Sequence, residues 1–537
     1  MNQLGRVNLG MEFLSDGRIQ EAAQLSSQLL AEASSDALVH YLACEVALAQ
    51  NQVGQALNHI NRAIEIDGQE PELRFKKASI ELICRQGLQA QDSASEVAAR
   101  FPDDPEIQLR AARIFTECGN HAGAEAFLLN AAVKDAKNPK FLFEYSTNQF
   151  FLGKIAEAEE AISDYLDLQL PVNGRKLLLR ARLRRQTQSH NHVEMLQNYL
   201  TQSLPKKEAV NCYYALAKEL EDLGEYVQSF EMLRSGAAAQ RQLVDFKLAD
   251  ELQNVRDVIE TFQPANYARI PDSTSEDAPV FIVGMPRTGT TLVERIISRH
   301  EGVRSAEETY DFTFAFSSVI NEYIAANQGR NLHPLSAALE VNYGEIANKY
   351  RNSMLGMLGK ADCYMDKTPF NFLYCGLIKK AFPKARILHL VRDPMDTCYA
   401  VFKTLFDHAY YYSYDLGELA DYYIGYRQIM DHWHKLMPGA ILDVSYEELV
   451  SSPHDVSRRI ADYVGFAWSK DLIEVQDSVV PCSTASAAQV REPIYTSSVG
   501  LWRNFEAELE PVRQKLSAAN IIDESGAAPR RKMPLSN

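Results

Sequence analysis

The spacing of apolar residues divides the chain into two parts with different periodicity. Residues 1–260 show helical spacing and few strand signals, whereas short continuous apolar runs appear after residue 280. Between them, residues 261–279 are rich in proline, serine and aspartate and interrupt the helical pattern. We therefore predict an all-α domain over 1–260, a linker over 261–279, a second domain over 280–520 and a disordered tail over 521–537.

The helical part repeats every 34 residues. Small residues hold one position in successive copies: Ala22, Ala56, Ala90, Ala124 and Ala158, with Ser229 in a degenerate later copy. Turn residues and helix-starting prolines recur at the same spacing: Gly17, Asn51, Gly119, Gly153, Pro71, Pro105 and Pro139. This period resembles the tetratricopeptide repeat, whose paired helices stack into a solenoid. A generic helical bundle with alanines aligned by chance is the alternative.

Beyond the linker, short β-rich runs alternate with longer helical patterns. The runs "PVFIVG", "ARILHLVRD" and "GAILDVSYEELV" have the composition of buried strands, and helices are expected over 309–327 and 415–436. Such alternation predicts an α/β P-loop-type three-layer domain with a parallel sheet. Ligands of these sheets bind at the carboxyl ends of the strands.

Composition narrows the function classes. The net charge of the 537-residue chain is −16, which disfavours a nucleic-acid partner. Eight cysteines are scattered without metal-ligand spacing and read as reduced residues of a cytosolic protein. No apolar stretch approaches the roughly 20 residues of a membrane span, and the N-terminus lacks signal-peptide features. We therefore expect a cytoplasmic protein.

The stretch "GMPRTGTT", residues 284–291, follows the first predicted strand and precedes a helix. Its glycines fit the phosphate-binding pattern G-x-x-x-x-G-K-[ST], but Thr290 replaces the lysine. Backbone N–H groups at the helix start, the hydroxyls of Thr290 and Thr291, and the guanidinium of Arg287 all favour an anion here. The loop is therefore predicted to hold a phosphate-like group without the Walker lysine.

The second strong run ends in Arg392 rather than in the acid that holds Mg²⁺ in NTPases. A cation at this strand tip favours an anion site without metal. A nucleotide with one 5′-anhydride and a further phosphate elsewhere suits such a site.

Two segments carry a family resemblance, "FIVGMPRTGTTLVERII" and "ARILHLVRDPMDTC", and "VRSAEETYDF" and "MDKTPFNF" extend it. They resemble the sulfotransferases that use 3′-phosphoadenosine 5′-phosphosulfate (PAPS), and most closely the tyrosylprotein sulfotransferase branch with its bacterial relatives that carry tetratricopeptide arms. The resemblance covers roughly 278–510. It implies PAPS as donor, adenosine 3′,5′-bisphosphate as product and no metal.

The resemblance also implies residue roles. Glu308, which follows Arg287 by 21 positions, matches the general base, Lys367 matches the lysine that stabilises the transferring group, and Ser486 assists it. Nucleotide contacts are implied for a further set: Arg287, Thr288, Gly289, Thr290, Thr291, Arg392, Tyr446 and Arg491. The sequence departs from the family at Ala400, where a serine usually contacts the 3′-phosphate, and Lys403 is a candidate replacement.

Simpler roles stay open for each of these residues. Glu308 could support a helix dipole, Lys367 could be solvated, and Arg392 could pair with Asp393. Either Ser483 or Thr484 could stand in for Ser486. The tyrosine-rich stretch 408–426 is expected to pack in the core, and His408, His432 and His434 are expected to be structural.

Two other functions remain as alternatives, a P-loop kinase or NTPase and a catalytically inactive repeat-based adaptor. The acceptor is left open between a peptide tyrosine, a glycan and a small alcohol or phenol. The repeat arm is expected to offer a surface for a protein partner.

Overall fold

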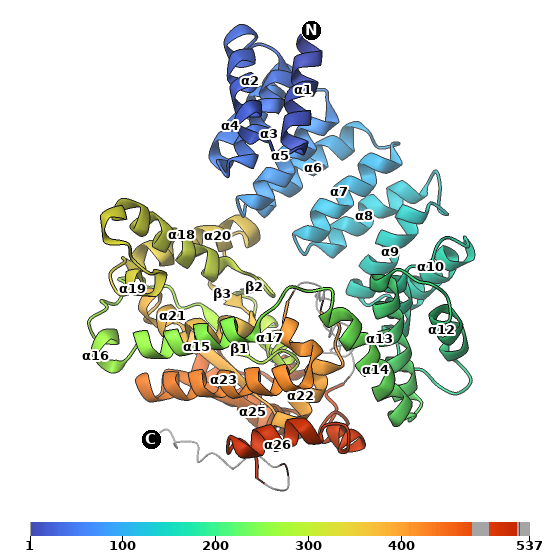
Figure 1. The fold of residues 1–537 in the computed structure, drawn as a ribbon, viewed down its shortest axis with the longest axis vertical. Helices are drawn as coiled ribbons and strands as arrows, with labels where there is room; N and C mark the ends of the chain where they lie inside the picture. Colours follow the sequence, from blue (N-terminus) through green and yellow to red (C-terminus); the bar gives the residue numbers. More distant parts are fainter. Residues whose placement is uncertain (1, 407–408, 475–492, 524–525, 527–537) are drawn as a thin grey trace. The chain divides into compact units, whose positions relative to one another are not determined.

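The structure of the chain is a computed structural model, shown in Figure 1. It describes residues 2–406, 409–474, 493–523 and 526. Contacts between residues define two compact units: Met1–Leu168 with Ser353–Lys360, and Gln169–Asn352 with Ala361–Asn537. The predicted domain boundary at residue 260 follows the repeat pattern rather than these contacts, and it stays a prediction.

The first unit is a series of antiparallel helix pairs (Figure 1). Its helices are α1 (Gln3–Ser15), α2 (Ile19–Glu32), α3 (Ala37–Ala49), α4 (Val53–Ile66), α5 (Pro71–Ile83), α6 (Gly87–Arg100), α7 (Pro105–Glu117), α8 (His121–Ala132), α9 (Pro139–Leu152) and α10 (Ile155–Asp167). The predicted prolines begin α5, α7 and α9, where a missing N–H costs no intrahelical bond. This arrangement confirms the tetratricopeptide solenoid.

Left-handed turn residues and buried alanines explain the repeat. The five predicted alanines are all fully buried, which lets the paired helices approach closely. Each pair turns through a residue with positive φ: Gly17, Asn51, Arg85, Gly119 and Gly153. Arg85 holds this position in the third copy, where the sequence offers neither glycine nor asparagine.

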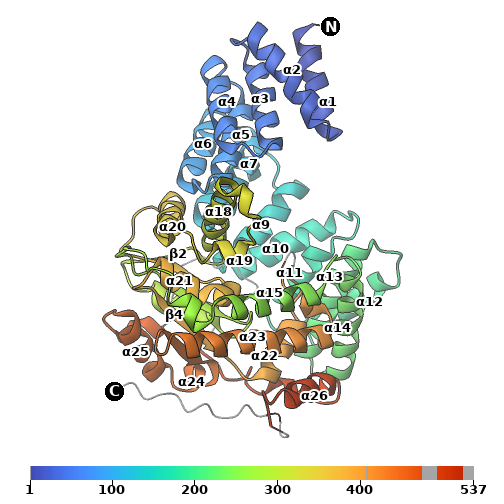
Figure 2. The same ribbon diagram turned by 60° about the vertical axis from the view of Figure 1, so that its left-hand side comes forward.

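More helices precede the sheet in the second unit: α11 (Gly174–Arg182), α12 (Val193–Leu200), α13 (Lys206–Asp222), α14 (Tyr226–Arg241), α15 (Leu248–Thr261) and α16 (Pro264–Tyr267). The hydroxyl of buried Ser229 donates a hydrogen bond of 2.7 Å to the carbonyl of Ala217. This bond joins α14 to α13 at the position where the earlier copies have a packed alanine. Helix α15 lies alongside α23 (Figures 1 and 2), and Phe262, in the predicted linker, is buried against Trp433.

A five-stranded parallel sheet forms the centre of the second unit. Its strands are β1 (Val280–Gly284), β2 (Val303–Ser305), β3 (Cys363–Asp366), β4 (Arg386–Val391) and β5 (Ile441–Ser445), in the order β2-β3-β1-β4-β5. The three predicted runs form β1, β4 and β5. The two strands that the apolar pattern did not indicate, β2 and β3, are short and partly exposed.

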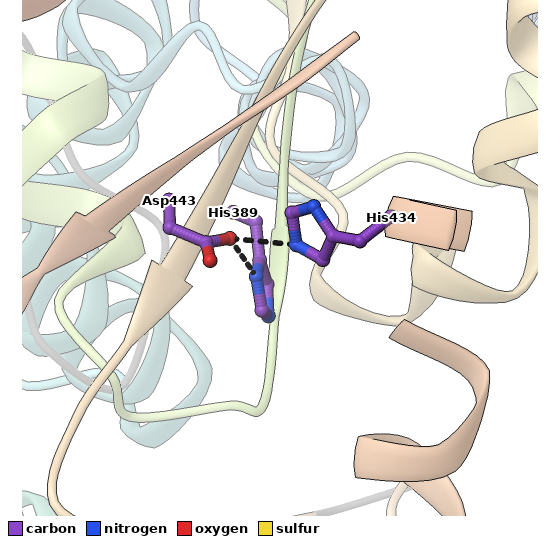
Figure 3. A group of neighbouring side chains, drawn as sticks. All are labelled: His389, His434 and Asp443. Atoms are coloured by element: carbon purple, nitrogen blue, oxygen red, sulfur yellow. Dashed lines mark hydrogen bonds and ion pairs between the residues drawn. The ribbon is translucent and has the colours of Figure 1, made fainter. Parts of the chain in front are cut away.

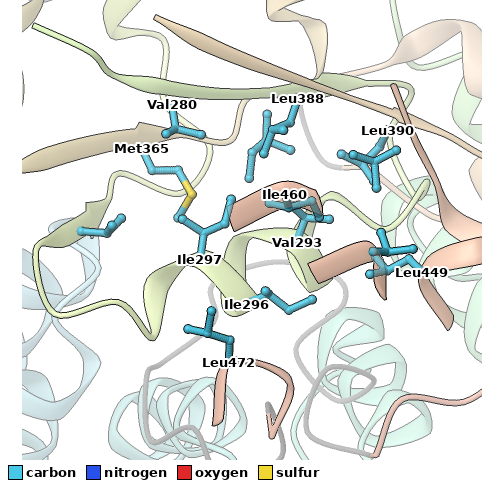
Figure 4. Close-up of a cluster of buried hydrophobic side chains, with 14 residues drawn as sticks. Val280, Val293, Ile296, Ile297, Met365, Leu388, Leu390, Leu449, Ile460 and Leu472 are labelled. Atoms are coloured by element: carbon cyan, nitrogen blue, oxygen red, sulfur yellow. The ribbon is translucent and has the colours of Figure 1, made fainter. Parts of the chain in front are cut away.

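Helices cover both faces of the sheet, which confirms the three-layer α/β architecture. The helices after β1 are α17 (Thr290–Ser298), α18 (Asp311–Ala326), α19 (Pro334–Ala337), α20 (Tyr343–Leu358), α21 (Cys375–Ala381), α22 (Pro394–Phe402), α23 (Leu416–Leu436), α24 (Tyr446–Ser451), α25 (Pro453–Val464) and α26 (Glu510–Ala518). On one face, strand side chains meet α17 and α25 in a buried apolar cluster, and Figure 4 labels Val280, Leu388, Leu390, Val293, Ile297 and Ile460 among its members. On the other face, Phe281 packs against Phe312 of α18 and Tyr350 of α20.

Within the described residues, no helix has both the length and the apolar character needed to cross a bilayer.

Candidate active site

The loop between β1 and α17 has a tightly constrained backbone. Gly284, Arg287 and Gly289 all have positive φ, at 147°, 65° and 98°. A Cβ atom on Gly284 would lie 2.7 Å from the carbonyl oxygen of Leu390, and one on Gly289 would lie 2.6 Å from Cδ2 of Tyr446. Only glycine fits these two positions without a shift of the neighbours. The backbone of the loop is therefore held against β4 and α24, with the N-terminus of α17 at its end.

Three threonines of the loop have different surroundings. The hydroxyl of Thr288 donates 2.8 Å to the carbonyl of Met285, so it stabilises the turn from within. Thr290 and Thr291 begin α17 and are nearly buried. Both residues lie in the first turn of α17, where the main-chain N–H groups point toward the loop.

Arg392, at the end of β4, connects the loop to the C-terminal segment. Its guanidinium donates 3.0 Å to the carbonyl of Arg287 and 2.6 Å to the carbonyl of Ser498. Its Cζ atom also lies 4.8 Å from the ring centroid of Tyr446, a cation–π distance. Asp393, the alternative partner, instead accepts from the N–H of Asp396 as the N-cap of α22. Arg392 therefore lies beside the loop, and its predicted contact with a nucleotide stays a prediction.

Tyr446 packs over the loop at the start of α24. Its ring covers Gly289, and its hydroxyl lies 2.6 Å from the hydroxyl of Ser498. Burial lowers the pKa of Arg287, and the positive charge of Arg392 adds to this effect. An anion in this region would therefore meet two neighbouring guanidinium groups, Arg287 and Arg392.

Lys367 and Glu308 form an ion pair in which the lysine is fully buried. Nζ of Lys367, just after β3, donates 2.9 Å to Oε1 of Glu308 and lies 3.6 Å from Oε2 of Glu294. The side chain of Glu308 is 43% exposed, so its carboxylate remains open to an incoming group. Burial alone would lower the pKa of Lys367, but the carboxylates of Glu294 and Glu308 raise it above its ordinary value. Lys367 is therefore a protonated buried cation and not a solvated one.

Part of the predicted site lies outside the described residues, namely Ser486, its alternatives Ser483 and Thr484, and Arg491. The chain after them is held firmly. Buried Asp396 accepts 2.6 Å from the N–H of Gly500 and 3.1 Å from the N–H of Trp502. These bonds fix the segment that brings Ser498 to Arg392 and Tyr446.

Lys403, the residue directly after α22, is paired with a carboxylate. Its ammonium lies 2.7 Å from Oε1 of Glu221 on α13, and the hydroxyl of Tyr399 donates 2.8 Å to the other oxygen of the same carboxylate. Ala400 is nearly buried. This ion pair gives Lys403 a structural partner between α13 and α22, which disfavours it as a replacement for the family serine.

A cluster of His389, His434 and Asp443 lies on the α23 side of the sheet (Figure 3). Among the described residues, this is the group whose ligand atoms lie close enough to hold a metal ion. However, Nδ1 of His389 and Nε2 of His434 lie 2.7 Å and 2.9 Å from one oxygen of Asp443, and Nε2 of His389 lies 2.5 Å from the hydroxyl of Tyr426. These are hydrogen-bonding distances, so the cluster joins β4, β5 and α23 as a polar network. His408 lies outside the described residues.

Most described tyrosines of the stretch 408–426 pack in the core, as predicted. Tyr412 stacks on Tyr422 with ring centroids 3.6 Å apart, and both are buried. Exposed aromatic side chains lie instead two and six residues after Glu308, at Tyr310 and Phe314. Tyr310 also contacts Phe370.

Sequence reasoning missed four residues of this region: Glu294, Ser498, Asp396 and Asp443. Each has only a weak local signal. Glu294 and Asp396 are acids on helices that are otherwise buried, and this mismatch between charge and burial could have drawn attention to them.

Fold and site together define a class, namely a P-loop-like α/β domain that follows a tetratricopeptide solenoid. Comparison with known families then shows which family models match these two parts of the chain. Residues 279–470 match the model of the Sulfotransferase family, and residues 13–80 match the Tetratricopeptide repeat. The match over residues 279–470 confirms the predicted resemblance to the sulfotransferase family.

Several known proteins are similar to parts of this chain. An uncharacterized protein of Aquifex aeolicus is 26% identical over 453 residues, which is 82% of this chain and 54% of that protein. Protein-tyrosine sulfotransferase A of Caenorhabditis elegans is 24% identical over 51% of this chain and 73% of its own length. Among solved structures, the sulfotransferase domain from the Synechococcus PCC 7002 olefin synthase is 20% identical, with a TM-score of 0.33, over 44% of this chain and 90% of that domain. The chain thus spans about half the length of its Aquifex relative.

Proposed function

We propose that the protein transfers the sulfuryl group of PAPS to an acceptor hydroxyl. The main support is the 2.9 Å contact between Lys367 and Glu308. The same ammonium also pairs with Glu294 on α17, the helix that follows the loop. The exposed carboxylate of Glu308 and the buried ammonium of Lys367 are thus joined to α17. The N-terminus of this helix faces the loop of residues 284–291, which we call the anion loop. This combination suits proton removal at one atom and charge stabilisation at the next.

The proposed step is an in-line displacement. Glu308 takes the proton of the acceptor hydroxyl as the acceptor oxygen forms its bond to sulfur. The bond from sulfur to the bridging oxygen breaks, and adenosine 3′,5′-bisphosphate leaves with that electron pair. Lys367 and Arg287 stabilise the negative charge that develops on the bridging and sulfuryl oxygens. Ser486 is proposed to assist Lys367.

The nucleotide is proposed to lie across the loop and the tip of β4. Thr288, Gly289, Thr290 and Thr291 would surround the 5′-phosphosulfate with backbone and hydroxyl donors. Arg392, Tyr446 and Arg491 would contact the rest of the nucleotide, with Arg392 on the 3′-phosphate. No metal is required, because two guanidinium groups and an ammonium supply the positive charge.

The kinase alternative has less support. Thr290 stands where a lysine would reach the β- and γ-phosphates, and an arginine follows the strand that would carry a Mg²⁺-binding acid. The inactive-adaptor alternative is disfavoured by the buried, doubly paired Lys367, which is costly to maintain without a use.

A turnover assay tests the proposal. Purified full-length protein is incubated with PAPS and a tyrosine peptide, a simple phenol, a primary alcohol or an oligosaccharide, and adenosine 3′,5′-bisphosphate is measured by anion-exchange chromatography. We expect acceptor-dependent product with at least one class. Glu308→Gln should lower the rate at least about a hundredfold, within the usual range for a general base. Glu322→Gln, which alters an exposed pair with Lys349, is the matched control.

Two outcomes would oppose the proposal. Hydrolysis of Mg-ATP in place of PAPS turnover would favour the kinase alternative. No turnover and no binding of either nucleotide would favour the adaptor.

We propose the acceptor and the partner of the repeat arm by chemical class. A peptide tyrosine, a glycan and a small alcohol or phenol all present a hydroxyl to Glu308, and the assay distinguishes them. The repeat arm is proposed to bind a protein partner, since tetratricopeptide solenoids present concave surfaces. We also propose a cytoplasmic location, in keeping with the seven described cysteines, all of which are free thiols.

A further inference from the structure

Two carboxylates, and not one, lie beside the buried ammonium of Lys367. Glu308, in the loop that follows β2, accepts a hydrogen bond of 2.9 Å from Nζ of Lys367. Oε2 of Glu294, on α17, lies 3.6 Å from the same nitrogen. The side chain of Lys367 is fully buried, and that of Glu294 is 8% exposed, whereas that of Glu308 is 43% exposed. The lysine is therefore shared between a solvent-facing acid and a buried one.

The buried acid is well anchored. The hydroxyl of Ser305, at the end of β2, donates to Oε1 of Glu294 and leaves Oε2 facing the lysine. The main-chain N–H of Lys367 donates 3.0 Å to the carbonyl of Glu307, which fixes the lysine backbone as well. Glu294 thus joins α17 to the end of β2 and to the residue that follows β3.

We propose that Glu294 is a positioning residue that keeps Lys367 charged and in place while Glu308 changes its protonation state. The inference rests on the proposed function. When Glu308 takes the acceptor proton, its carboxylate loses its charge, and the ion pair with Lys367 weakens. Glu294 retains its charge on the other side of the ammonium. Lys367 can then remain a cation and donate toward the leaving oxygen at the moment when its first partner is neutralised.

The charged and titratable groups around this pair come from several elements. Those that interact electrostatically with Lys367 or Glu308 include Glu294, Glu307, Arg287, Tyr310 and Tyr410. Of these, Glu294 is the buried carboxylate with a described ion pair to the lysine. A change there should act mainly through the ammonium.

Two substitutions test the inference. Glu294→Gln keeps the side-chain volume and the acceptor for Ser305 but removes the charge, and Glu294→Asp keeps the charge. We expect Glu294→Gln to lower kcat about tenfold with little change in KM for PAPS. The loss should grow only at alkaline pH, as the pH approaches the lowered pKa of Lys367 and its ammonium loses the proton. Glu294→Asp should recover part of kcat, and Glu322→Gln should match the wild type.

A second readout does not depend on turnover. The titration of the Lys367 ammonium is followed by NMR of the lysine Nζ nitrogen, with the signal assigned through Lys367→Met. In Glu294→Gln, the midpoint should fall by about one pH unit or more. An unchanged midpoint together with a wild-type kcat–pH profile would overturn the inference. If wild-type protein shows no sulfuryl transfer, the proposed function fails, and the titration still decides whether Glu294 controls the charge of Lys367.

Discussion

At the scale of single residues, the second unit contains ionisable side chains that are fully buried. Lys367 is fully buried and forms ion pairs with the carboxylates of Glu294 and Glu308. The Coulomb attraction of these pairs compensates for the loss of hydration of the ammonium. Asp366, its neighbour at the end of β3, is also fully buried, and Asn371 donates 3.2 Å to one of its oxygens. Burial raises the pKa of Asp366 to about 7, with a further contribution from Asp311 that hydrogen bonds from Thr368 and Asn371 partly oppose.

This raised pKa predicts a pH-dependent stability. A carboxyl group with a raised pKa favours folding in its protonated form, so its contribution is complete below its ordinary pKa and is lost as pH rises through about 7. Asp366→Asn removes the titration and keeps an acceptor for Asn371. We expect the variant to gain stability relative to wild type as pH rises from about 5 to about 8, measured by denaturant unfolding. A stability difference that is constant over this range would contradict the prediction.

Residue chemistry was predictable from sequence only where it lay in a motif. Arg287, Glu308, Lys367 and Arg392 stand at matching positions of short motifs, and the structure assembles Lys367 with Glu308 and Arg392 with the loop. Glu294 could not be assigned in this way, because its role comes from a lysine 73 positions away in the sequence. Ser498 is similar, since its contacts with Arg392 and Tyr446 depend on how β4 and β5 pair.

At the scale of elements, strong periodicity made most of the fold predictable. The strands β1, β4 and β5 are buried apolar runs, and α18 and α23 fall within a few residues of their predicted bounds. In contrast, β2 has three residues and β3 has four, and both contain partly exposed positions. Strands this short exist because neighbouring strands pair with them, so a local pattern does not predict them. Arg85 likewise adopts its left-handed turn because the repeat geometry requires it.

The anion loop yields a prediction at this scale. Gly289→Ala places a Cβ atom 2.6 Å from the ring of Tyr446 at a residue with positive φ, so both the loop and the ring must shift. We expect it to weaken adenosine 3′,5′-bisphosphate binding at least about tenfold and to cost about 1–3 kcal/mol of stability. Binding is measured by calorimetry and stability by denaturant unfolding.

A matched glycine separates packing from backbone strain. Gly465 has a similar φ of 94°, but a Cβ atom there meets nothing within 4 Å. Gly465→Ala should therefore lose about 1 kcal/mol through strain alone and bind the nucleotide normally. Equal binding losses in both variants would show that the contact with Tyr446 is not what shapes the loop.

At the scale of the whole molecule, the chain consists of two compact units with separate cores. The solenoid core is built from alanines and apolar residues of successive helix pairs, and the core of the second unit is centred on the sheet. The predicted helical domain over 1–260 crosses this division, since α11–α15 belong to the second unit by their contacts. Repeat spacing predicts which helices resemble each other, whereas side-chain contacts determine which helices belong together.

Two compact units predict two unfolding events. In scanning calorimetry, adenosine 3′,5′-bisphosphate should raise the transition of the sheet-containing unit and leave that of the solenoid unchanged, because a ligand stabilises only the unit that binds it. At about 100 times Kd, the stabilisation amounts to about 2.7 kcal/mol. Fragments released by limited proteolysis during heating assign the transitions. A single transition that moves as one would contradict the prediction.

We propose that the loop and the tip of β4 form a donor site for a nucleotide with phosphates on both its 3′ and its 5′ oxygen. It is tested most directly by isothermal titration of the full chain with adenosine 3′,5′-bisphosphate, adenosine 5′-phosphate and Mg-ATP, in wild type and in Arg287→Ala. Arg503→Ala, which alters an exposed pair with Glu506, is the control. We predict micromolar binding of the bisphosphate without metal, weaker binding of the monophosphate, and loss of binding in Arg287→Ala only. Preference for Mg-ATP, or bisphosphate binding that is the same in all three proteins, would show that this region is not such a donor site.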